Sequence, residues 1–178
     1  MNVEIKLSTE DDAPIIRNLW PLYQHDVSAF DGAVPNQHGI FSSDNETATW
    51  AQHAASLDSW WRDPHALFPY LIRVDGAPAG FNLIAAQARL DKGISADFVV
   101  HEFFVLHAYR GSSTAERAAV EGFNQHRGKW EVVTYPTHLK GILFWRRVIG
   151  QYTAMQFSEE EIDHPWGRKV AFHFDNAI

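Results

Sequence analysis

The sequence predicts an α/β fold in one domain. Residues 98–106 form an almost continuously apolar, β-rich run, as expected of a strand that is buried on both faces. Residues 114–125 place small and apolar side chains at helical spacing, with charged residues on the other side. Two further strand-like runs at 68–74 and 79–86 are separated by Asp75-Gly76, a dipeptide that favours a hairpin turn.

The elements before this hairpin follow from the same patterns. Residues 3–8 alternate like a strand, and a capping pattern at 9–12 opens a helix. An apolar stripe continues this helix, although Pro21 should kink or break it. Residues 26–46 are rich in Asp, Gly, Ser and Asn and predict a loop, whereas aromatic and small residues at helical spacing predict a helix over 47–62.

The C-terminal elements complete the order. We expect a strand at 130–135, a helix at 137–149, and two final strands at 151–158 and 168–174. A helix connects the strand at 98–106 to the strand at 130–135, so these two strands should be parallel.

The composition limits the possible partners. The 178 residues are 46% hydrophobic, which suits a single domain over 1–178 with a substantial core. A net charge of −7 disfavours nucleic acid as a partner. No apolar stretch is long enough to span a bilayer and no signal peptide is recognisable, so we expect a cytoplasmic protein without a membrane partner. The chain has no cysteine and its ten histidines lack metal-site spacing, so no metal is expected.

The turn between the strand at 98–106 and the helix at 114–125 has the features of a phosphate site. A helix N-terminus leaves backbone N–H groups unpaired and carries partial positive charge, which attracts phosphate. The residues expected to bind a diphosphate are Arg110, Gly111, Ser112, Ser113, Thr114 and Ala115.

This strand, turn and helix resemble the GNAT superfamily of acetyl-CoA-dependent N-acyltransferases. ArgGlySerSerThrAla at 110–115 is similar to the family's Arg/Gln-x-x-Gly-x-Gly/Ala loop, with Ser113 where the family usually has glycine. The resemblance extends over 96–157, including LysTrpGluValValThr and IleLeuPheTrpArgArgValIle as the following strand and helix. It implies a mixed, strongly twisted sheet of about six to seven strands with helices on both faces. Acetyl-CoA would wedge between two splayed strands, at 97–106 and 130–135.

The resemblance also implies roles along the strand that precedes the loop. A bulge at 104–106 would aim the Leu106 amide at the thioester carbonyl, and backbone groups of Phe104 and Val105 would bind pantetheine. Glu102 is the only carboxylate within 98–106. It suits a general base that acts through water, or a group that holds the substrate ammonium; a hydrogen-bonded structural glutamate is the alternative.

The general acid is left open. In the matching helix, Trp145 stands where many members have tyrosine, and His138 stands where asparagine would contact the cofactor. Indole does not ionise usefully, so the candidates for protonating the thiolate are Tyr152, His138 and water.

Acidic and aromatic residues predict the acceptor side of the site. Arg62 is the only Lys or Arg between residues 26 and 63. Carboxylates beside aromatic faces attract ammonium groups. This acidic bias comes from Asp26, Asp31, Asp44, Glu46, Asp58 and Asp63, around the tryptophans at 60–61. The residues expected to bind the acceptor are Asp26, Asp31, Asp58, Trp60 and Glu102.

The sequence therefore predicts an acetyl-CoA-dependent N-acetyltransferase, a monomer or homodimer, that acts on a cationic small-molecule amine. Aminoglycoside antibiotics are the first candidate, and the chain resembles the kasugamycin-type 2′-N-acetyltransferase branch. Two other hypotheses remain: an acetyltransferase for polyamine, peptide or protein amines, and a non-catalytic regulator that binds acyl-CoA.

Overall fold

A seven-stranded mixed sheet organises the chain, for which a computed structural model describes residues 1–41 and 49–177. The strand order is β1-β2-β3-β4-β5-β7-β6. The strands are β1 (Val3–Leu7), β2 (Leu67–Val74), β3 (Ala77–Ala86), β4 (Phe98–Val105), β5 (Lys129–Thr134), β6 (Ser158–His164) and β7 (Gly167–Asp175). Neighbouring strands are antiparallel except β4 and β5, whose predicted parallel pairing is confirmed.

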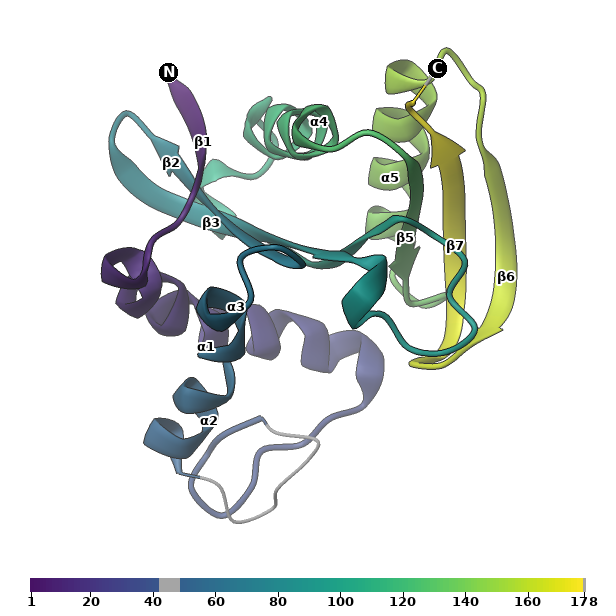
Figure 1. Ribbon diagram of the computed structural model, residues 1–178. Coiled ribbons are helices and arrows are strands. Elements are labelled where there is room, and N and C mark those ends of the chain that lie inside the picture. The colour runs from purple at the N-terminus through teal and green to yellow at the C-terminus, as the bar shows by residue number, and fades with distance from the viewer. Residues whose placement is uncertain (42–48, 178) are drawn as a thin grey trace.

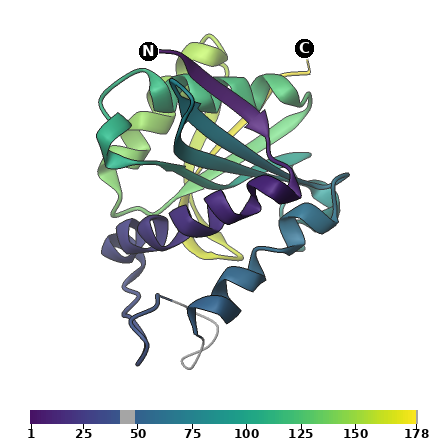
Figure 2. The same ribbon diagram turned by 90° about the vertical axis from the view of Figure 1, so that its left-hand side faces the viewer.

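Helices cover both faces of this sheet, as expected (Figure 1). One face carries α4 (Thr114–Gln125) and α5 (Leu139–Tyr152), and the other carries α1 (Ala13–Asp31), α2 (Trp50–Ser56) and α3 (Ser59–Arg62). Three short 3₁₀ turns connect elements: η1 (Glu10–Asp12), η2 (Gln87–Arg89) and η3 (His107–Tyr109). Figure 2 shows α1 running along the underside of the strands.

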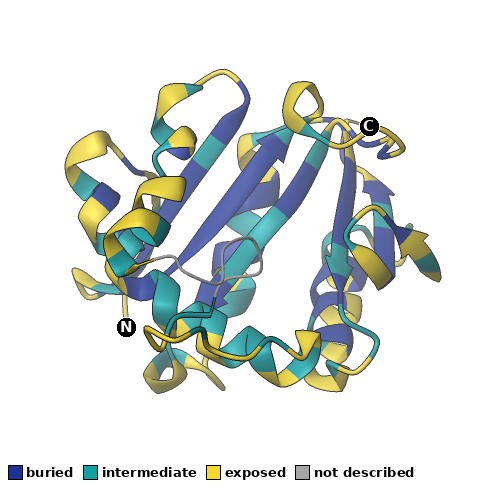
Figure 3. Cartoon of the chain, turned by 90° about the horizontal axis from the view of Figure 1, so that it is seen from below, coloured by how far each residue is buried: buried dark blue, intermediate teal, exposed yellow. Residues whose placement is uncertain are grey.

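The alternation of side chains along each strand divides the core into two layers. On β4, Phe103 packs with the cluster under α4 and α5, whereas Phe104 packs with the cluster over α1 and α3. The first cluster is centred on Phe123 and Trp130, both almost fully buried. In the view from the α1 side, the strands are largely buried and the surrounding turns and outer helix faces are exposed (Figure 3).

The two predicted turn signals near the N-terminus are confirmed. The Thr9 amide donates to the Asp12 carboxylate at 3.2 Å, which caps the turn before α1. Asp75 and Gly76 both have positive φ, 49° and 83°, as the two-residue hairpin between β2 and β3 requires.

The first long helix differs from the prediction. It continues through Pro21 to Asp31 and ends at Gly32, whose φ of 74° suits glycine, so the expected break at Pro21 is wrong. The predicted loop starts after residue 31 and not at residue 26. Packing of the apolar stripe against the sheet outweighs the one backbone hydrogen bond that proline removes. Asp26 and Asp31 therefore lie on helix α1 and not in a loop.

Two other predicted elements are also corrected. The expected helix at 47–62 is divided into α2 and α3 by the turn at 57–58, and residues 42–48 lie outside the described part of the chain. The expected strand at 151–158 is wrong: α5 runs to Tyr152, Ala154 and Met155 have positive φ, and β6 begins only at Ser158.

Candidate active site

The parallel strands β4 and β5 separate after a short shared segment. They pair only from Phe98↔Trp130 to Val100↔Val132, although β4 continues to Val105 and β5 to Thr134. Beyond this point the facing edges of the two strands are unpaired with each other. The result is a gap in the middle of the sheet, lined by backbone polar groups.

A bulge at His101 accompanies this separation. The register with β3 changes from Leu83↔Glu102 to Ile84↔Val100, which leaves His101 as the extra residue. A β-bulge bends its strand and increases the local twist, so it directs the rest of β4 away from β5. The expected bulge at 104–106 is therefore wrong, because the irregularity lies earlier in the strand.

The Leu106 amide is not available as a donor. It donates to the Ala79 carbonyl at 2.7 Å, so its predicted role in polarising the thioester is wrong. Backbone groups alternate in direction along a strand, so those of Phe104 also face β3, which contradicts its predicted backbone contact with pantetheine. The groups of Phe103 and Val105 face the gap instead, and the Val105 carbonyl accepts a hydrogen bond from Arg110 Nε at 2.7 Å.

The start of α4 presents several free amides at the edge of this gap. In the part of the chain that the structure describes, the N–H groups of Gly111, Ser112, Ser113 and Ala115 have no hydrogen-bond acceptor. The remaining two residues of the predicted loop use theirs: the Arg110 amide donates to His107 and the Thr114 amide to the Ser112 hydroxyl. Four of the six predicted diphosphate ligands therefore offer an unpaired donor.

Glycine is required at one position of this loop, and that position is not 113. Gly111 has a φ of 77°, whereas Ser113 has an ordinary φ of −72°. The exposed Ser113 hydroxyl has no hydrogen-bond partner among the described residues. The serine is accommodated without backbone strain, and its hydroxyl faces solvent beside the free amides.

Helix α1 passes across the gap on one face of the sheet. It contacts residues on the β4 side and at the start of α5, which follows β5. Tyr23 donates a hydrogen bond to the Glu102 carboxylate on β4, and Asp26 pairs with the Arg110 guanidinium beyond β4. One turn later, Phe30 stacks on His138 at the start of α5, with ring centroids 4.0 Å apart. These α1 residues recur at helical spacing on one face.

Glu102 lies on the α1 side of the gap, about one-quarter exposed. Besides Tyr23, its carboxylate has His101 Nδ1 at 3.5 Å. Burial raises the pKa of Tyr23 well above its usual value, and the neighbouring Glu102 carboxylate raises it further, so the phenol keeps its proton. Among the described residues, Glu102 is thus held in place by a neutral donor and makes no ion pair with Lys or Arg.

Tyr135 and Lys169 form the opposite wall and were missed by the sequence analysis. Tyr135 directly follows β5, and the Lys169 ammonium lies 3.3 Å from the centre of its ring. The carboxylates of Glu102 and Asp31 influence the pKa of both side chains, so the four groups form one cluster. The position of Tyr135 at the carboxyl end of a parallel strand was a usable signal, because such ends line ligand sites. No comparable signal marks Lys169.

The other predicted cofactor residues have different outcomes. His138 lies at the mouth of the gap, between Phe30 and the Thr134 hydroxyl at 3.4 Å; burial and then Arg110 lower its pKa, so it is neutral at pH 7. Trp145 is 6% exposed and packs in the core against Phe103, so it is not a surface contact for a cofactor.

Tyr152 is too far from the gap to act as its acid. It ends α5, about 20 Å from the helix start at the usual rise per residue. Its hydroxyl donates to Asn124 and accepts from Asn176, both at 3.1 Å. The predicted catalytic role of Tyr152 is therefore wrong, and the residue is a structural link between helix α4 and the C-terminal segment.

Two of the predicted acceptor residues have structural roles instead. Trp60 is 8% exposed and packs in the core, with its edge toward His101, so its predicted exposure to substrate is wrong. Asp58 pairs with Arg17 and Arg62, so its charge is already neutralised. Asp26, Asp31 and Glu102 are brought together at the gap, whereas Asp44 and Glu46 lie outside the described residues.

The described residues contain neither a metal site nor a membrane-spanning helix. No group of three His, Cys, Asp or Glu side chains there could hold a metal ion. Within the same residues, no helix has the length and apolar character needed to cross a membrane.

Comparison with known proteins identifies the fold. No family model matches the sequence, and no curated protein matches it. An acetyltransferase from Thermus thermophilus is similar in structure, with a TM-score of 0.63 and 15% identity over 98% of this chain and 97% of the other. A GNAT-family acetyltransferase from Streptococcus agalactiae has a TM-score of 0.65, with 10% identity over 97% and 95%. AAC(6')-Ib in complex with ribostamycin and coenzyme A has a TM-score of 0.66, with 16% identity over 98% and 94%. The chain therefore has the GNAT fold.

Proposed function

We propose that this protein transfers the acetyl group of acetyl-CoA to an amino group of a cationic small molecule. The observation that carries the proposal is the gap between β4 and β5, which opens beside the free amides at the start of α4. Unpaired amides at a helix N-terminus suit a diphosphate, and the facing strand edges suit the extended, amide-containing pantetheine arm. Neither feature is needed for the stability of an ordinary βα unit.

The residues around the gap can carry out the reaction by direct attack. The Phe103 and Val105 amides point into the gap and replace Leu106 as candidate donors to the developing oxyanion. Glu102 accepts a proton from the substrate ammonium, directly or through water, and the neutral amine then attacks the thioester carbon. Collapse of the tetrahedral intermediate breaks the C–S bond and releases the thiolate of coenzyme A.

The charges around the gap favour a cationic acceptor. Asp31 on α1 and Glu102 on β4 both act electrostatically on Tyr135 and Lys169, and their negative charge attracts an ammonium group to this side of the gap. Aminoglycosides are the first candidates, since AAC(6')-Ib shares the fold and holds ribostamycin in its structure. The resemblance to the kasugamycin-type 2′-N-acetyltransferase branch supports the same substrate class without fixing which amino group reacts.

A thiol-release assay tests this function. The purified protein is incubated with acetyl-CoA and, in separate reactions, with aminoglycosides, polyamines and peptides, and free thiol is measured against a blank without acceptor. We expect turnover with at least one aminoglycoside, and raised inhibitory concentrations when the protein is expressed in a susceptible bacterium. Turnover with polyamines or peptides alone would overturn the aminoglycoside assignment and keep the enzyme class.

A non-catalytic regulator that binds acyl-CoA is the second candidate. Trp145 in the core, where the family often has tyrosine, favours it. Calorimetry separates the two: tight coenzyme A binding without thiol release from any amine identifies a regulator. Absence of coenzyme A binding contradicts both.

A further inference from the structure

Lys169 is a buried cation without a counter-ion. The residue is 4% exposed on β7, and among the described residues its ammonium makes neither a hydrogen bond nor an ion pair. Burial lowers its pKa, although the Glu102 and Asp31 carboxylates oppose this effect. An ammonium group without such partners is costly to bury, so a structural role alone does not account for it.

The group that Lys169 does contact is the ring of Tyr135, at 3.3 Å. The Tyr135 hydroxyl has no hydrogen-bond partner in the described part of the chain, whereas Tyr23 donates to Glu102 and Tyr152 donates to Asn124. Burial, then Asp31 and Glu102, raise the pKa of Tyr135 above its usual value, so its phenol carries a proton at neutral pH. The Tyr135 hydroxyl is thus protonated, lies beside the gap, and makes no hydrogen bond to another described residue.

Acetyl transfer from a thioester is accelerated by such a donor. The thiolate that leaves when the C–S bond breaks gains a proton to give coenzyme A, and a positioned acid that supplies this proton during bond breaking stabilises the leaving group in the transition state. The position at which the family often has tyrosine is filled here by Trp145, which is buried in the core. His138 is neutral at pH 7 because burial lowers its pKa, so its ring has no readily lost proton.

We propose that Tyr135 protonates the departing thiolate and that Lys169 is the positioning residue that makes this possible. This inference rests on the proposed acetyltransferase function. The phenol O–H bond breaks as the S–H bond forms, and the resulting phenolate is stabilised by the adjacent ammonium. Protonated Glu102 returns to the phenolate the proton that it took from the substrate ammonium. The second proton, which the nitrogen loses as the amide forms, is released to solvent. The net products are the amide, coenzyme A and one proton.

Tyr135→Phe is the first test. With acetyl-CoA we expect kcat to fall by about 100-fold or more, as is typical for loss of a general acid, while KM for acetyl-CoA stays unchanged. Tyr152→Phe is the matched control and keeps wild-type kcat, because its hydroxyl lies at the far end of α5. Wild-type kcat in Tyr135→Phe would overturn the proposal.

A change of leaving group makes the test specific. An acetyl thioester of an acidic aryl thiol releases a thiolate that needs no proton. If Tyr135 is the acid, the defect of Tyr135→Phe should largely disappear with this substrate. A defect of the same size with both thioesters would contradict the acid role, even if kcat with acetyl-CoA is low.

Two substitutions of Lys169 separate the effect of its positive charge from the effect of losing the side chain. Lys169→Met should lower kcat with acetyl-CoA and leave KM unchanged, and Lys169→Arg should restore most of kcat because it keeps a cation beside Tyr135. Thermal unfolding of both variants identifies loss of folding. Equal kcat in a folded Lys169→Met and the wild type would overturn the positioning role. If the wild type itself transfers no acetyl group to any amine, the proposed function fails first.

Discussion

The Asp26 carboxylate on α1 pairs with the Arg110 guanidinium at the start of the loop that is predicted to bind a diphosphate. The same guanidinium donates to the Val105 carbonyl at 2.7 Å, so it is held against the end of β4. Arg110, which the sequence predicts to bind the diphosphate, is therefore paired with Asp26, which the sequence predicts to bind the acceptor. One residue predicted to bind the cofactor is thus in contact with one predicted to bind the acceptor.

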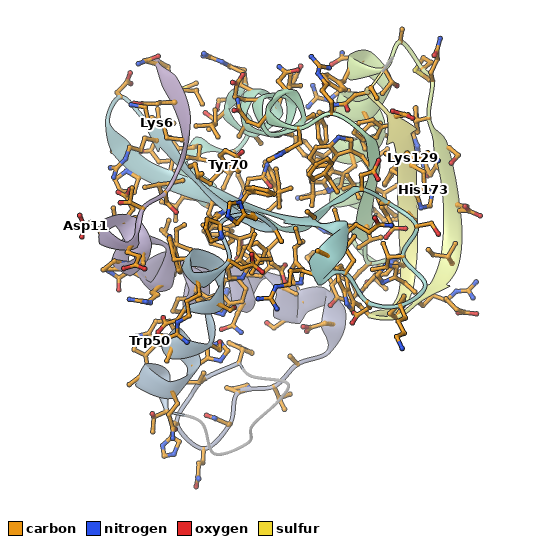
Figure 4. The ribbon with its side chains drawn as sticks, viewed as in Figure 1. Lys6, Asp11, Trp50, Tyr70, Lys129 and His173 are labelled. Atoms are coloured by element: carbon orange, nitrogen blue, oxygen red, sulfur yellow. The ribbon has the colours of Figure 1, made fainter. Side chains whose placement is uncertain are left out.

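This pair makes coenzyme A affinity depend on Asp26. Asp26→Asn removes a competitor for Arg110 and a negative charge near the phosphates, so we expect coenzyme A to bind more tightly. Both side chains are exposed, and such pairs contribute up to about 1 kcal/mol, which limits the gain to about fivefold in Kd. Calorimetric titration measures it. Asp11→Asn is the control, because Asp11, labelled in Figure 4, is exposed and lies before the first residue of α1, about four helical turns from Asp26. Weaker binding in Asp26→Asn would contradict the competition.

Ser113 is expected to contribute its hydroxyl to the diphosphate site. Its backbone does not require glycine, so Ser113→Ala and Ser113→Gly remove the same hydroxyl without removing strain. Each should weaken coenzyme A binding by about 2- to 10-fold, the effect of one hydrogen bond of about 0.5–1.5 kcal/mol. The exposed Ser158 on β6 supplies a control, Ser158→Ala. Tighter binding in Ser113→Gly would instead mean that the side chain obstructs the phosphates.

Glu102 is expected to act on turnover and not on cofactor binding. Glu102→Gln keeps the shape of the side chain but cannot accept the ammonium proton, so kcat should fall by about 100-fold or more with KM for acetyl-CoA unchanged. Thiol-release kinetics at saturating acceptor provide the measurement. The exposed Glu161 on β6 offers a control in Glu161→Gln. Unchanged turnover in Glu102→Gln would remove the residue from the mechanism.

Trp145 should affect stability alone. It packs against Phe103, Phe123 and Phe144 in the main core cluster. Trp145→Phe should lower the free energy of unfolding by about 0.5–3 kcal/mol, as for core substitutions generally, and leave coenzyme A affinity unchanged. Urea unfolding and calorimetry on one preparation measure both quantities. A large loss of affinity in a stable variant would return Trp145 to the cofactor site.

A second charged cluster should make stability depend on pH. Glu131 on β5 is buried and hydrogen-bonds to His164 at 3.1 Å and His173 at 2.7 Å. Burial alone would raise the pKa of Glu131, but the hydrogen bonds from His173 and His164 outweigh it and lower the pKa. The hydrogen bond to Glu131 raises the pKa of His173, which Figure 4 labels on β7.

These two shifts define the pH window. The lowered pKa of Glu131 stabilises the fold above its unfolded value of about 4.3, and this is lost as the pH falls through the folded value. The raised pKa of His173 stabilises the fold below about pH 6.5, and this is lost as the pH rises through the folded value. Urea unfolding from pH 4 to 9 should therefore show the pair's greatest contribution between these limits. His173→Gln should reduce the loss of unfolding free energy as the pH rises above about 6.5. His65→Gln, a change at an exposed histidine, is the control and should leave this loss unchanged. The same pH dependence in His173→Gln and the wild type would contradict the assignment.

The errors in the sequence analysis share a cause. Pro21 and the polar residues after it have local preferences for a break and a loop, yet α1 continues because its apolar face packs on the sheet. Trp60 deviates from the apolar stripe of one long helix, but the turn at 57–58 starts a second helix, in which Trp60 is buried. A stripe extended across this turn, as if one helix continued, gives the wrong face for Trp60.

The sequence by itself determined the order of strands and helices, the parallel pair around α4, and the turn at 110–115, because these depend on side-chain periodicity and local turn chemistry. Only the tertiary structure decided which groups face the gap. The Leu106 amide donates to Ala79 on β3, and the Tyr23 hydroxyl donates to Glu102. Lys169, on the last strand of the chain, lies over the ring of Tyr135. Such contacts join residues far apart in the chain, and they depend on strand register and on the bulge at His101, which no local pattern specifies.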